Sequence, residues 1–372
     1  MIDNIKIINS CLKIQDGHLL KFDESKTIKK TIVIPEGITV ICKDSFKNCV
    51  NIESVILPKT LKTIEENAFQ SCANLKSVLI PFGITSIQDG AFSSCQSLTT
   101  IELPISIINV GKKLFSGCKK LKKIEFSNSN LSYSFNNGFE TVNDCLTFFD
   151  HTINTEQNLT IPYGVTTIGE KAFYKCNTII VVTIPTSVKG IENGAFASCS
   201  SLCIVDYPMN ILNFGRGIFA NCTELMPIKI VNRLTNYYFV NGLEIHDRCL
   251  TFFDQTINKG KNINIPHGVT SIGEYAFQNC TNIRTVTFPK NLRMIEEGAF
   301  AGSGITDITI PEEITSIEKN TFYKCNNLRN INIPDSVKFI DESSFLECPN
   351  LQDNFQNNGN NIKKYFGLEP VC

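Results

Sequence analysis

The chain has 372 residues, of which 42% are hydrophobic and 19% charged, and its formal net charge is −1 at pH 7. So balanced a charge gives no long-range field of one sign, which excludes nucleic acid and anionic membrane surfaces as partners attracted by charge. The apolar residues never run together for the roughly 18 positions that a membrane-spanning helix needs, so we expect no membrane insertion.

The chain begins with MIDNIKIINSCLKIQDGHLLKF, which has no basic start followed by an uninterrupted apolar stretch. It therefore lacks the pattern of a secretory signal peptide, and by this criterion we expect a cytoplasmic protein. Asp16-Gly17 stands between two extended runs, and such a turn dipeptide favours a β-hairpin. We predict that residues 1–34 form an N-terminal hairpin that caps the fold.

From residue 35 onward, one pattern returns eleven times in register, and a proline marks each copy. The prolines are Pro35, Pro58, Pro81, Pro104, Pro162, Pro185, Pro208, Pro266, Pro289, Pro311 and Pro334. Most steps are 23 residues, one is 22 and two are 58. A fixed period of this size predicts stacked units that share one continuous core, so we expect one solenoid in place of the two or three domains that the length suggests.

Each repeat predicts one short coil of the chain. Counted from the proline, aliphatic residues occupy positions −3, −1, +3 and +6 almost throughout, as Ile101, Leu103, Ile107 and Val110 do. The alternation before the proline predicts a half-buried strand, which the proline ends because it has no N–H group. Positions +3 to +6 predict a second short extended segment, and the AF-x-x-C segment after it predicts a helical turn or a tight bend. The expected fold is a β-rich solenoid with stacked short parallel strands.

Two further positions predict side-chain ladders through the core. Position +11 is always Phe, and position +14 is Cys in ten repeats, with Ser303 in the repeat that is one residue short. The ladder phenylalanines are Phe46, Phe69, Phe92, Phe115, Phe173, Phe196, Phe219, Phe277, Phe300, Phe322 and Phe345. The ladder cysteines are Cys49, Cys72, Cys95, Cys118, Cys176, Cys199, Cys222, Cys280, Cys325 and Cys348. We expect the aromatic rings to fill one edge of the core and the small sulfur side chains a narrower corner.

The cysteine spacing is that of the repeat, and it differs from the paired C-x-x-C spacing of zinc ligands. The chain also has only four His residues. We interpret the cysteines as buried, reduced thiols, with disulfide bonds and metal ligation as the alternatives. Many free thiols favour a reducing compartment.

The two 58-residue steps contain longer units, at 127–161 and 231–265. Residues 145–150 and 249–254 both read CLTFFD, and their offset of 104 residues also separates Pro58 from Pro162, which indicates a duplicated block. Asn137-Gly138 and Asn241-Gly242 predict a hairpin in each unit. The CLTFFD pair is either a functional element or a hairpin that packs its Phe onto the solenoid, and we favour the hairpin.

These elements give a predicted domain organisation. We expect a single solenoid over residues 1–351, with regular repeats at 35–126, 162–230 and 266–351. Residues 352–372 are Asn-rich but carry several apolar side chains, so we predict a cap over the last coil.

The repeats, such as IPYGVTTIGEKAFYKCNTIIVVTIP, resemble the BspA-type leucine-rich repeat over roughly Ile5 to Leu351. The resemblance implies a right-handed leucine-rich-repeat coil with a curved sheet on one side. Members of that family are surface antigens and adhesins of bacteria and parasitic protozoa. It therefore implies a cell-surface adhesin with a protein ligand, such as a host or extracellular matrix protein. An intracellular protein–protein interaction scaffold is the alternative.

No motif of an enzyme is present: the chain has no GxSxG, no HExxH, no P-loop and no GxGxxG that opens a helix. Carboxylate pairs such as Glu65-Glu66 stand in the turn before the Phe, where exposed charge is expected. We expect no enzymatic activity and no catalytic, cofactor-binding or metal-binding residues.

The outward-facing positions −4, −2 and +1 form the broad surface on which a repeat solenoid binds its partners. Most of these positions are polar, but several early ones are apolar. This apolar stripe consists of Val33, Ile56, Leu79, Phe82, Ile105, Tyr163, Val181 and Ile204. Apolar residues on neighbouring strands favour an interaction site. The alternatives are a stripe covered by the N-terminal hairpin or by a self-contact, and a monomer is favoured.

Overall fold

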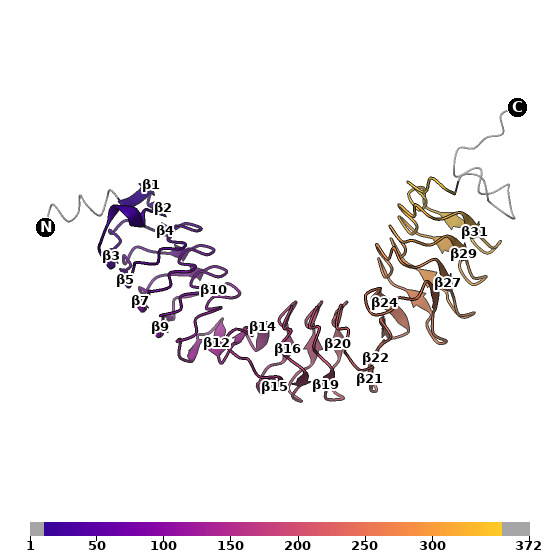
Figure 1. Cartoon of the computed structure of the whole chain (residues 1–372), viewed down its shortest axis with the longest axis horizontal. Helices are drawn as coiled ribbons and strands as arrows, with labels where there is room; N and C mark the ends of the chain where they lie inside the picture. Colours follow the sequence, from indigo (N-terminus) through magenta and orange to yellow (C-terminus); the bar gives the residue numbers. More distant parts are fainter. Residues whose placement is uncertain (1–10, 352–372) are drawn as a thin grey trace, which may run out of the picture. The chain divides into compact units, whose positions relative to one another are not determined.

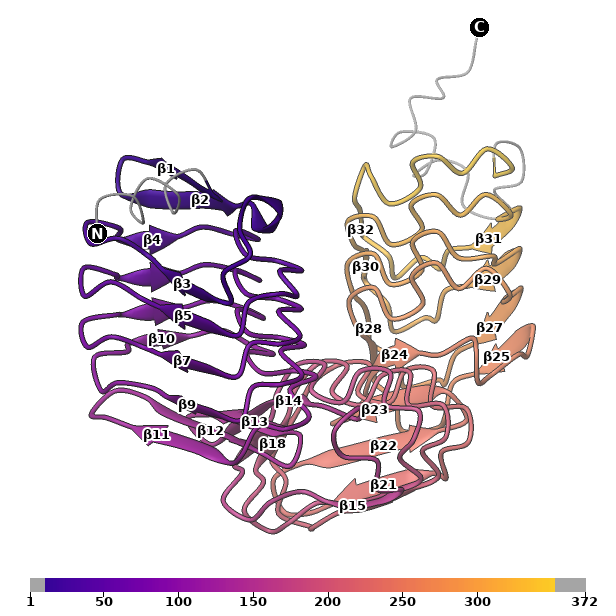
Figure 2. The same cartoon turned by 60° about the vertical axis from the view of Figure 1, so that its left-hand side comes forward.

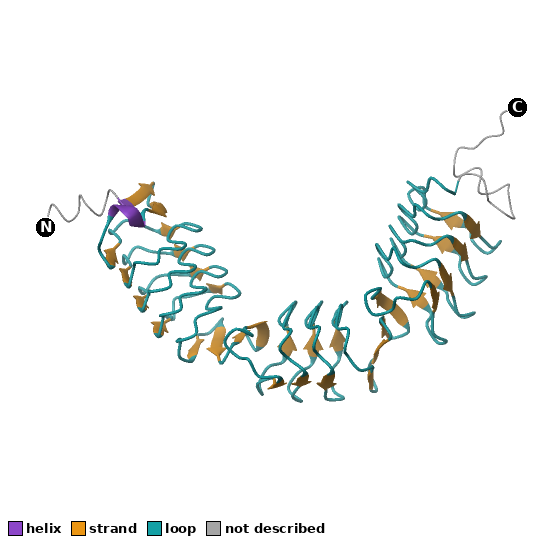
Figure 3. Ribbon diagram, in the orientation of Figure 1, coloured by secondary structure: helices purple, strands orange, loops and turns teal. Residues whose placement is uncertain are grey.

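The computed structural model describes residues 11–351. These residues contain 32 short strands and the 3-10 helix η1 at Glu24–Lys26. Turns and loops join the strands throughout (Figure 3). No helix in this part of the chain is long and apolar enough to cross a membrane.

The chain divides into two compact units. Unit 1 is Met1–Ile179 with Pro185–Val188, and unit 2 is Ile180–Ile184 with Lys189–Cys372. Each unit is a β-solenoid built from the predicted coils, and Figure 1 labels many of the strands. The prediction of a single solenoid domain over residues 1–351 stays a prediction.

The segment before each proline forms a strand of three residues. In unit 1 these strands are β3 (Thr31–Val33), β5 (Ser54–Ile56), β7 (Ser77–Leu79), β9 (Thr100–Glu102) and, after the longer unit, β15 (Asn158–Thr160). The first four form one parallel sheet in the order β3-β5-β7-β9 (Figure 2). Residues of equal repeat position are partners, so Ile32, Val55 and Val78 lie side by side and are buried.

The segment after each proline forms a second, shorter strand. In unit 1 these are β4 (Val40–Ile41), β6 (Thr63–Ile64), β8 (Ser86–Ile87), β10 (Asn109–Val110) and β16 (Thr167–Ile168). The N-terminal hairpin is present as β1 (Leu12–Gln15) and β2 (His18–Phe22), with Asp16 and Gly17 at its turn. Strand β2 pairs with β4 in parallel, so the hairpin extends the sheet of shorter strands.

The AF-x-x-C segments are turns, which is the tight bend of the two predicted forms. Two residues have a positive φ in ten of the eleven turns, as Asn67 (56°) and Ser71 (60°) do, and the last turn has one, Glu347 (58°). Backbone hydrogen bonds connect most turns to the next coil, as the Phe46 N–H does to the Ala68 carbonyl at 2.8 Å. Other amides bond within the turn, as the Cys72 N–H does to the Phe69 carbonyl at 3.2 Å, so the turns are held both by their own bonds and by the neighbouring coils.

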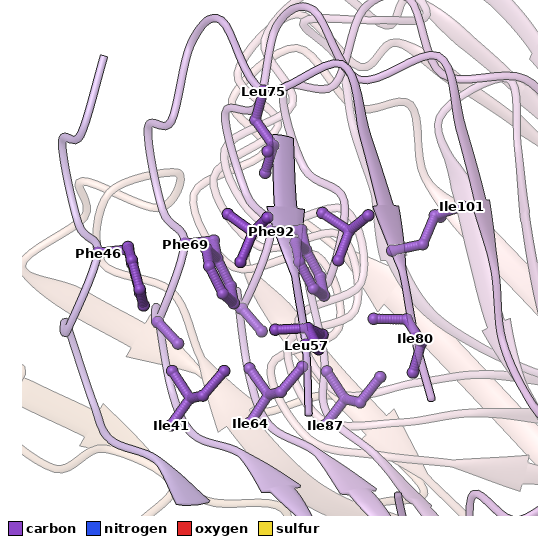
Figure 4. Close-up of a cluster of buried hydrophobic side chains, with 14 of the residues drawn as sticks. Ile41, Phe46, Leu57, Ile64, Phe69, Leu75, Ile80, Ile87, Phe92 and Ile101 are labelled. Atoms are coloured by element: carbon purple, nitrogen blue, oxygen red, sulfur yellow. The ribbon is translucent and has the colours of Figure 1, made fainter. Parts of the chain in front are cut away.

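The predicted phenylalanine ladder is present beneath these turns. Phe46, Phe69 and Phe92 stack with ring centroids 4.9 and 5.2 Å apart (Figure 4). Phe22 of the hairpin stacks on Phe46 at 4.9 Å and so continues the ladder to the first coil. The rings are fully buried, and a parallel row of Ile41, Ile64 and Ile87 packs beside them (Figure 4).

The cysteine ladder uses its sulfur atoms as donors. In six coils the thiol donates to the carbonyl oxygen of the ladder Phe in the preceding coil, at 3.0–3.2 Å; these thiols belong to Cys72, Cys95, Cys118, Cys222, Cys325 and Cys348. A thiol is small and apolar yet can donate a weak hydrogen bond, which suits a buried corner lined by carbonyl groups. The fifteen cysteines of the described residues are present without disulfide bonds.

The first longer unit is an antiparallel meander of four strands. These are β11 (Ile124–Ser127), β12 (Ser132–Asn136), β13 (Phe139–Val142) and β14 (Cys145–Phe149). Strand β14 pairs with β16 in parallel, and Phe149 stacks on Phe173 at 5.1 Å. The last strand of the meander therefore acts as one more coil of the solenoid.

Unit 2 repeats this plan. Its strands are β17 (Val181–Thr183), β18 (Gly190–Ile191), β19 (Ile204–Asp206), β20 (Asn213–Phe214), β21 (Ile228–Val231), β22 (Asn236–Val240), β23 (Leu243–His246), β24 (Cys249–Phe253), β25 (Asn262–Asn264), β26 (Ser271–Ile272), β27 (Thr285–Thr287), β28 (Met294–Ile295), β29 (Asp307–Thr309), β30 (Ser316–Ile317), β31 (Asn330–Asn332) and β32 (Phe339–Ile340). Strands β21–β24 form the second meander, and β25, β27, β29 and β31 form a parallel sheet. The predicted cap at 352–372 lies outside the described residues.

We predict that the ladder thiols of the folded protein resist alkylation at neutral pH. The thiolate is the reactive form, and burial raises the pKa of Cys49 and of Cys280 to about 12. Iodoacetamide labelling followed by mass spectrometry should modify the half-buried Cys42 and Cys203 first and the ladder cysteines only after denaturation. Equal labelling rates in the folded and denatured protein would contradict the buried ladder.

Candidate protein-binding surface

The centre of the candidate surface is a row of three apolar side chains on neighbouring strands. Val33, Ile56 and Leu79 are direct register partners on β3, β5 and β7. Their exposed fractions are 42%, 50% and 75%. Side chains alternate between the two faces of a strand. Because the residue before each of these three is buried in the core, the three side chains point to solvent.

Two further apolar side chains lie just past the ends of this sheet. Phe82 follows Pro81 and Ile105 follows Pro104, where each proline ends its strand segment. Phe82 is 73% exposed and Ile105 67% exposed. The row and these two residues together form what we call the apolar face, which consists of Val33, Ile56, Leu79, Phe82 and Ile105.

A polar rim bounds the apolar face on the side before the strands. Lys30 and Lys76 both reach Glu53, with Nζ–Oε distances of 2.6 Å. These two ammonium groups lower the pKa of Glu53 to about 2. The ion pairs are exposed and contribute little stability, but they fix charge beside an apolar centre. An apolar centre with a charged rim is the usual anatomy of a protein-binding site.

The structure does not place all residues of the predicted apolar stripe on one sheet. Strand β9 places Glu102 beside Leu79 and so ends the apolar row. Tyr163, which is 84% exposed, follows β15 and lies outside the β3-β5-β7-β9 sheet. Val181 is half-buried and pairs with Ile204 across β17 and β19 of unit 2. The residue pattern identified outward positions, but the longer unit after the fourth repeat interrupts the sheet on which they lie.

The described part of the N-terminal hairpin does not cover the apolar face. Strands β1 and β2 add to the sheet of shorter strands, whereas the apolar face belongs to the other sheet. Sequence reasoning overlooked Ile108, which is 57% exposed and lies three residues after Ile105. Position +4 is Thr or Lys in most repeats, so the isoleucine there was a signal that could have identified it.

The duplicated CLTFFD segments have structural roles in the described chain. Phe149 and Phe253 are ladder rings, and each stacks on the Phe of the next coil. Asp150 is 1% exposed; its Oδ2 accepts the Gly117 N–H at 2.5 Å and its Oδ1 accepts the Thr152 N–H at 2.9 Å. The Gly117 contact connects the meander to the preceding coil, and the Thr152 contact lies within the longer unit.

Each longer unit also buries one glutamate. Glu244 accepts the N–H groups of Gly217 and Ile218, at 2.6 and 3.1 Å, and the Tyr237 hydroxyl at 2.7 Å. Its duplicate Glu140 lies near the backbone amides of Lys113 and Leu114, but neither carboxyl oxygen has a partner in hydrogen-bonding geometry among the described residues. Burial raises the pKa of Glu140 to about 8, and the nearby amides offset only part of that rise.

The described residues hold no group of three or more His, Cys, Asp or Glu side chains placed to bind a metal ion. The ladder thiols donate to backbone carbonyls, and the buried carboxyl groups lie against backbone amides. The cysteine and carboxylate side chains of the core thus serve to hold the coils together.

Six copies of the BspA type leucine rich repeat region match at residues 20–144, 147–247 and 244–366. The chain belongs to this family. The resemblance inferred from the repeat sequence is confirmed, as is the leucine-rich-repeat solenoid that it implied.

Several solved structures of BspA-like or other leucine-rich repeat proteins are similar to this chain. A leucine rich cell surface protein from Faecalibacterium prausnitzii A2-165 is 23% identical, with 94% of this chain and 92% of that chain covered and a TM-score of 0.42. A leucine-rich repeat protein from Eubacterium ventriosum is 19% identical, with 92% of each chain covered and a TM-score of 0.45. The pneumococcal vaccine antigen PcpA is 19% identical, with 91% and 77% covered and a TM-score of 0.38. No curated protein matches the chain at a significant level.

We predict that Glu140→Gln makes the stability of this BspA-type repeat protein less dependent on pH. The folded pKa of about 8 lies above the ordinary 4.5, so the stability associated with the neutral carboxyl is complete below pH 4.5 and is lost as the pH rises through 8. The unfolding free energy of the variant relative to the wild type should therefore rise by about 1.4 kcal/mol per pH unit inside that window. Urea denaturation below, within and above the window measures this difference.

Glu125→Gln, at an exposed position of the neighbouring strand β11, is the matched control for the loss of one carboxylate. A difference between Glu140→Gln and wild type that stays constant across the window would contradict a buried titrating carboxyl.

Proposed function

We propose that this chain is a non-enzymatic repeat protein that binds a protein ligand through the apolar face on the sheet of β3, β5, β7 and β9. The observation that carries the proposal is the in-register exposure of Val33, Ile56 and Leu79. Contiguous exposed apolar side chains with a polar rim are typical of interaction sites, whereas single exposed ones are common on any surface.

The shape of the apolar face suits a protein ligand better than a small molecule. It presents Leu79 and Phe82 as the most exposed side chains, at 75% and 73%; Leu79 projects from the sheet and Phe82 from the turn that follows it. Large apolar side chains of this kind contribute most of the binding energy when a partner buries them and excludes water. The flanking Lys30–Glu53–Lys76 ion pairs then select partners with matching charge.

Membership of the BspA-type family supports a surface antigen or adhesin, because adhesion to host proteins or other cells is what the resemblance implied. The absence of catalysis is part of the same proposal. It is supported by the structural use of the core cysteines and glutamates in the described coils.

One observation favours the alternative of an intracellular scaffold. The fifteen described cysteines are present without disulfide bonds, although secreted proteins commonly oxidise such residues. The ladder geometry weakens this argument, since thiols this deeply buried are protected wherever the protein lies.

We predict that the triple variant Ile56→Ser, Leu79→Ser, Phe82→Ser loses ligand binding and keeps its fold. All three side chains are at least half exposed, so their removal takes little from the core. The intact biotinylated chain, used to capture proteins from an extracellular matrix extract, should retain a partner that the variant does not. The circular-dichroism melt of the variant should be nearly unchanged.

The matched control is Met294→Ser with Phe339→Ser, which removes two apolar side chains that are 52% and 51% exposed on the shorter strands of unit 2. The control should capture the same partner as the wild type. Equal capture by the triple variant and the wild type would refute the apolar face as the binding site.

Labelling of intact cells with a membrane-impermeant reagent separates the two locations. We expect the chain to be labelled without permeabilisation, as a surface antigen requires. Labelling that appears only after permeabilisation would favour the intracellular scaffold and leave the apolar face as its binding site.

A further inference from the structure

The first meander shortens one turn of the solenoid. Leu146 is the register partner of Ile168, and the Phe149 N–H donates to the Ala172 carbonyl at 2.9 Å, so both ends of the segment match the next coil. Only two residues separate Leu146 from Phe149, whereas four separate Ile168 from Phe173. Thr147 and Phe148 therefore replace a longer projecting turn, and the row of turns is cut back at this point.

A groove of about 550 Å³ lies at this cut-back turn, entirely within unit 1. Its walls come from repeat positions +8, +9 and +12 of the coils before and after the meander, with Thr147 between them. A volume of this size is in the range of small-ligand sites. The groove is separate from the apolar face, which lies on the strands.

The floor of the groove holds an unused polar group. Ser93 is 6% exposed, and its Oγ has no hydrogen-bond partner among the described residues. Gly90 lies beside it: a Cβ added there would come within 2.6 Å of Asn67 Oδ1 and 3.4 Å of Ser93 Oγ. The missing side chain at Gly90 leaves only thin cover over this buried hydroxyl on the groove side, and a buried hydroxyl without a partner points to a ligand that supplies one.

The charges of the groove do not cancel once their contacts are considered. Glu66 is paired with Lys43 at 2.7 Å, Asp89 accepts the Lys112 backbone N–H at 2.9 Å, and Glu170 pairs with Lys171 at 3.3 Å.

By contrast, the ammonium groups of Lys112 and Lys113 form no ion pair with any residue in the described range, and Lys113 Nζ lies over the Phe148 ring at 5.2 Å. Asp89 is the one carboxylate of the lining without an ion pair, so the two unpaired ammonium groups leave the groove with a net positive charge.

We infer that this groove binds an acidic saccharide. Serine, threonine, asparagine and glutamine side chains line it and can both donate to and accept from sugar hydroxyls. Tyr174 is 45% exposed in the same wall and offers a flat ring to the apolar face of a pyranose. The unpaired Lys112 and Lys113 form ion pairs with the carboxylate of the saccharide, and the buried Ser93 Oγ forms a hydrogen bond with one of its hydroxyl groups at the floor of the groove.

The duplicated block gives an internal comparison. Unit 2 has the same shortened turn, since Leu250 pairs with Ile272 and Phe253 stacks on Phe277. There Gly217 stands in place of Lys113, and Tyr275, which donates to Glu297 at 2.8 Å, stands in place of Lys171. The saccharide site is accordingly a property of unit 1, not of the duplicated turn as such.

Binding of sialyllactose and of a hyaluronan tetrasaccharide to the full chain, measured by isothermal titration calorimetry, tests the inference. Lactose and diacetylchitobiose are the neutral comparisons. We expect an acidic sugar to bind, the neutral sugars to bind at least roughly tenfold more weakly, and Lys112→Gln with Lys113→Gln to lower the affinity roughly tenfold or more.

Two further variants make the test specific to the groove. Lys119→Gln with Lys120→Gln removes the same charge from exposed positions outside the lining and should leave binding unchanged. Gly90→Asn keeps the positive φ that Asn67 adopts at the equivalent position and should weaken binding by filling the floor. Absence of binding by both acidic sugars, equal binding of neutral sugars, or equal losses in the two lysine pairs would each overturn the inference. Because the apolar face is intact in all these variants, capture of a protein partner is an independent result.

Discussion

The stacking of one aromatic ring per coil is the interaction on which the rest of each unit depends. Rings such as Phe46, Phe69 and Phe92 repeat at 4.9–5.2 Å, which is close to the spacing that hydrogen-bonded strands impose. The same spacing lets each turn bond to the next turn, as Phe69 N–H does to the Ala91 carbonyl at 2.8 Å. Strand pairing, turn bonding and ring stacking therefore share one period, and a coil that satisfies one satisfies all three.

The cysteines complete that arrangement. A carbonyl of the ladder Phe accepts the N–H of its own Cys, as Phe69 does from Cys72 at 3.2 Å, and also the thiol of the next coil's Cys95 at 3.2 Å. A larger side chain would not fit the corner, and an alanine would leave the second bond unmade. This local requirement explains the cysteine at that position without any redox or metal chemistry.

The longer units show how a duplicated block diverges while keeping its fold. In unit 2 the Phe214 ring stacks on Tyr237 at 4.3 Å, and Tyr237 bonds Glu244. In unit 1 the smaller Val110 replaces Phe214, and the Tyr133 hydroxyl and the Glu140 carboxyl are buried without that bond. Both meanders still supply a ladder Phe through a turn shortened by two residues, so the solenoid continues and its outer row of turns is recessed.

The sequence alone determined the repeat period, the proline that ends each strand, and the Phe and Cys ladders. Every coil has the same local requirement, and eleven copies are enough to identify the residues that meet it. The outward direction of Val33, Ile56 and Leu79 followed from alternation along a strand. Only the tertiary structure decided which outward residues share a sheet, since Val181 and Ile204 lie on strands beyond the first meander and Tyr163 lies in a turn there. The tertiary structure was also needed to place Ser93, Lys113 and Tyr174 around one groove. That groove depends on the register between a shortened turn and its neighbouring coils, and no single repeat contains this information.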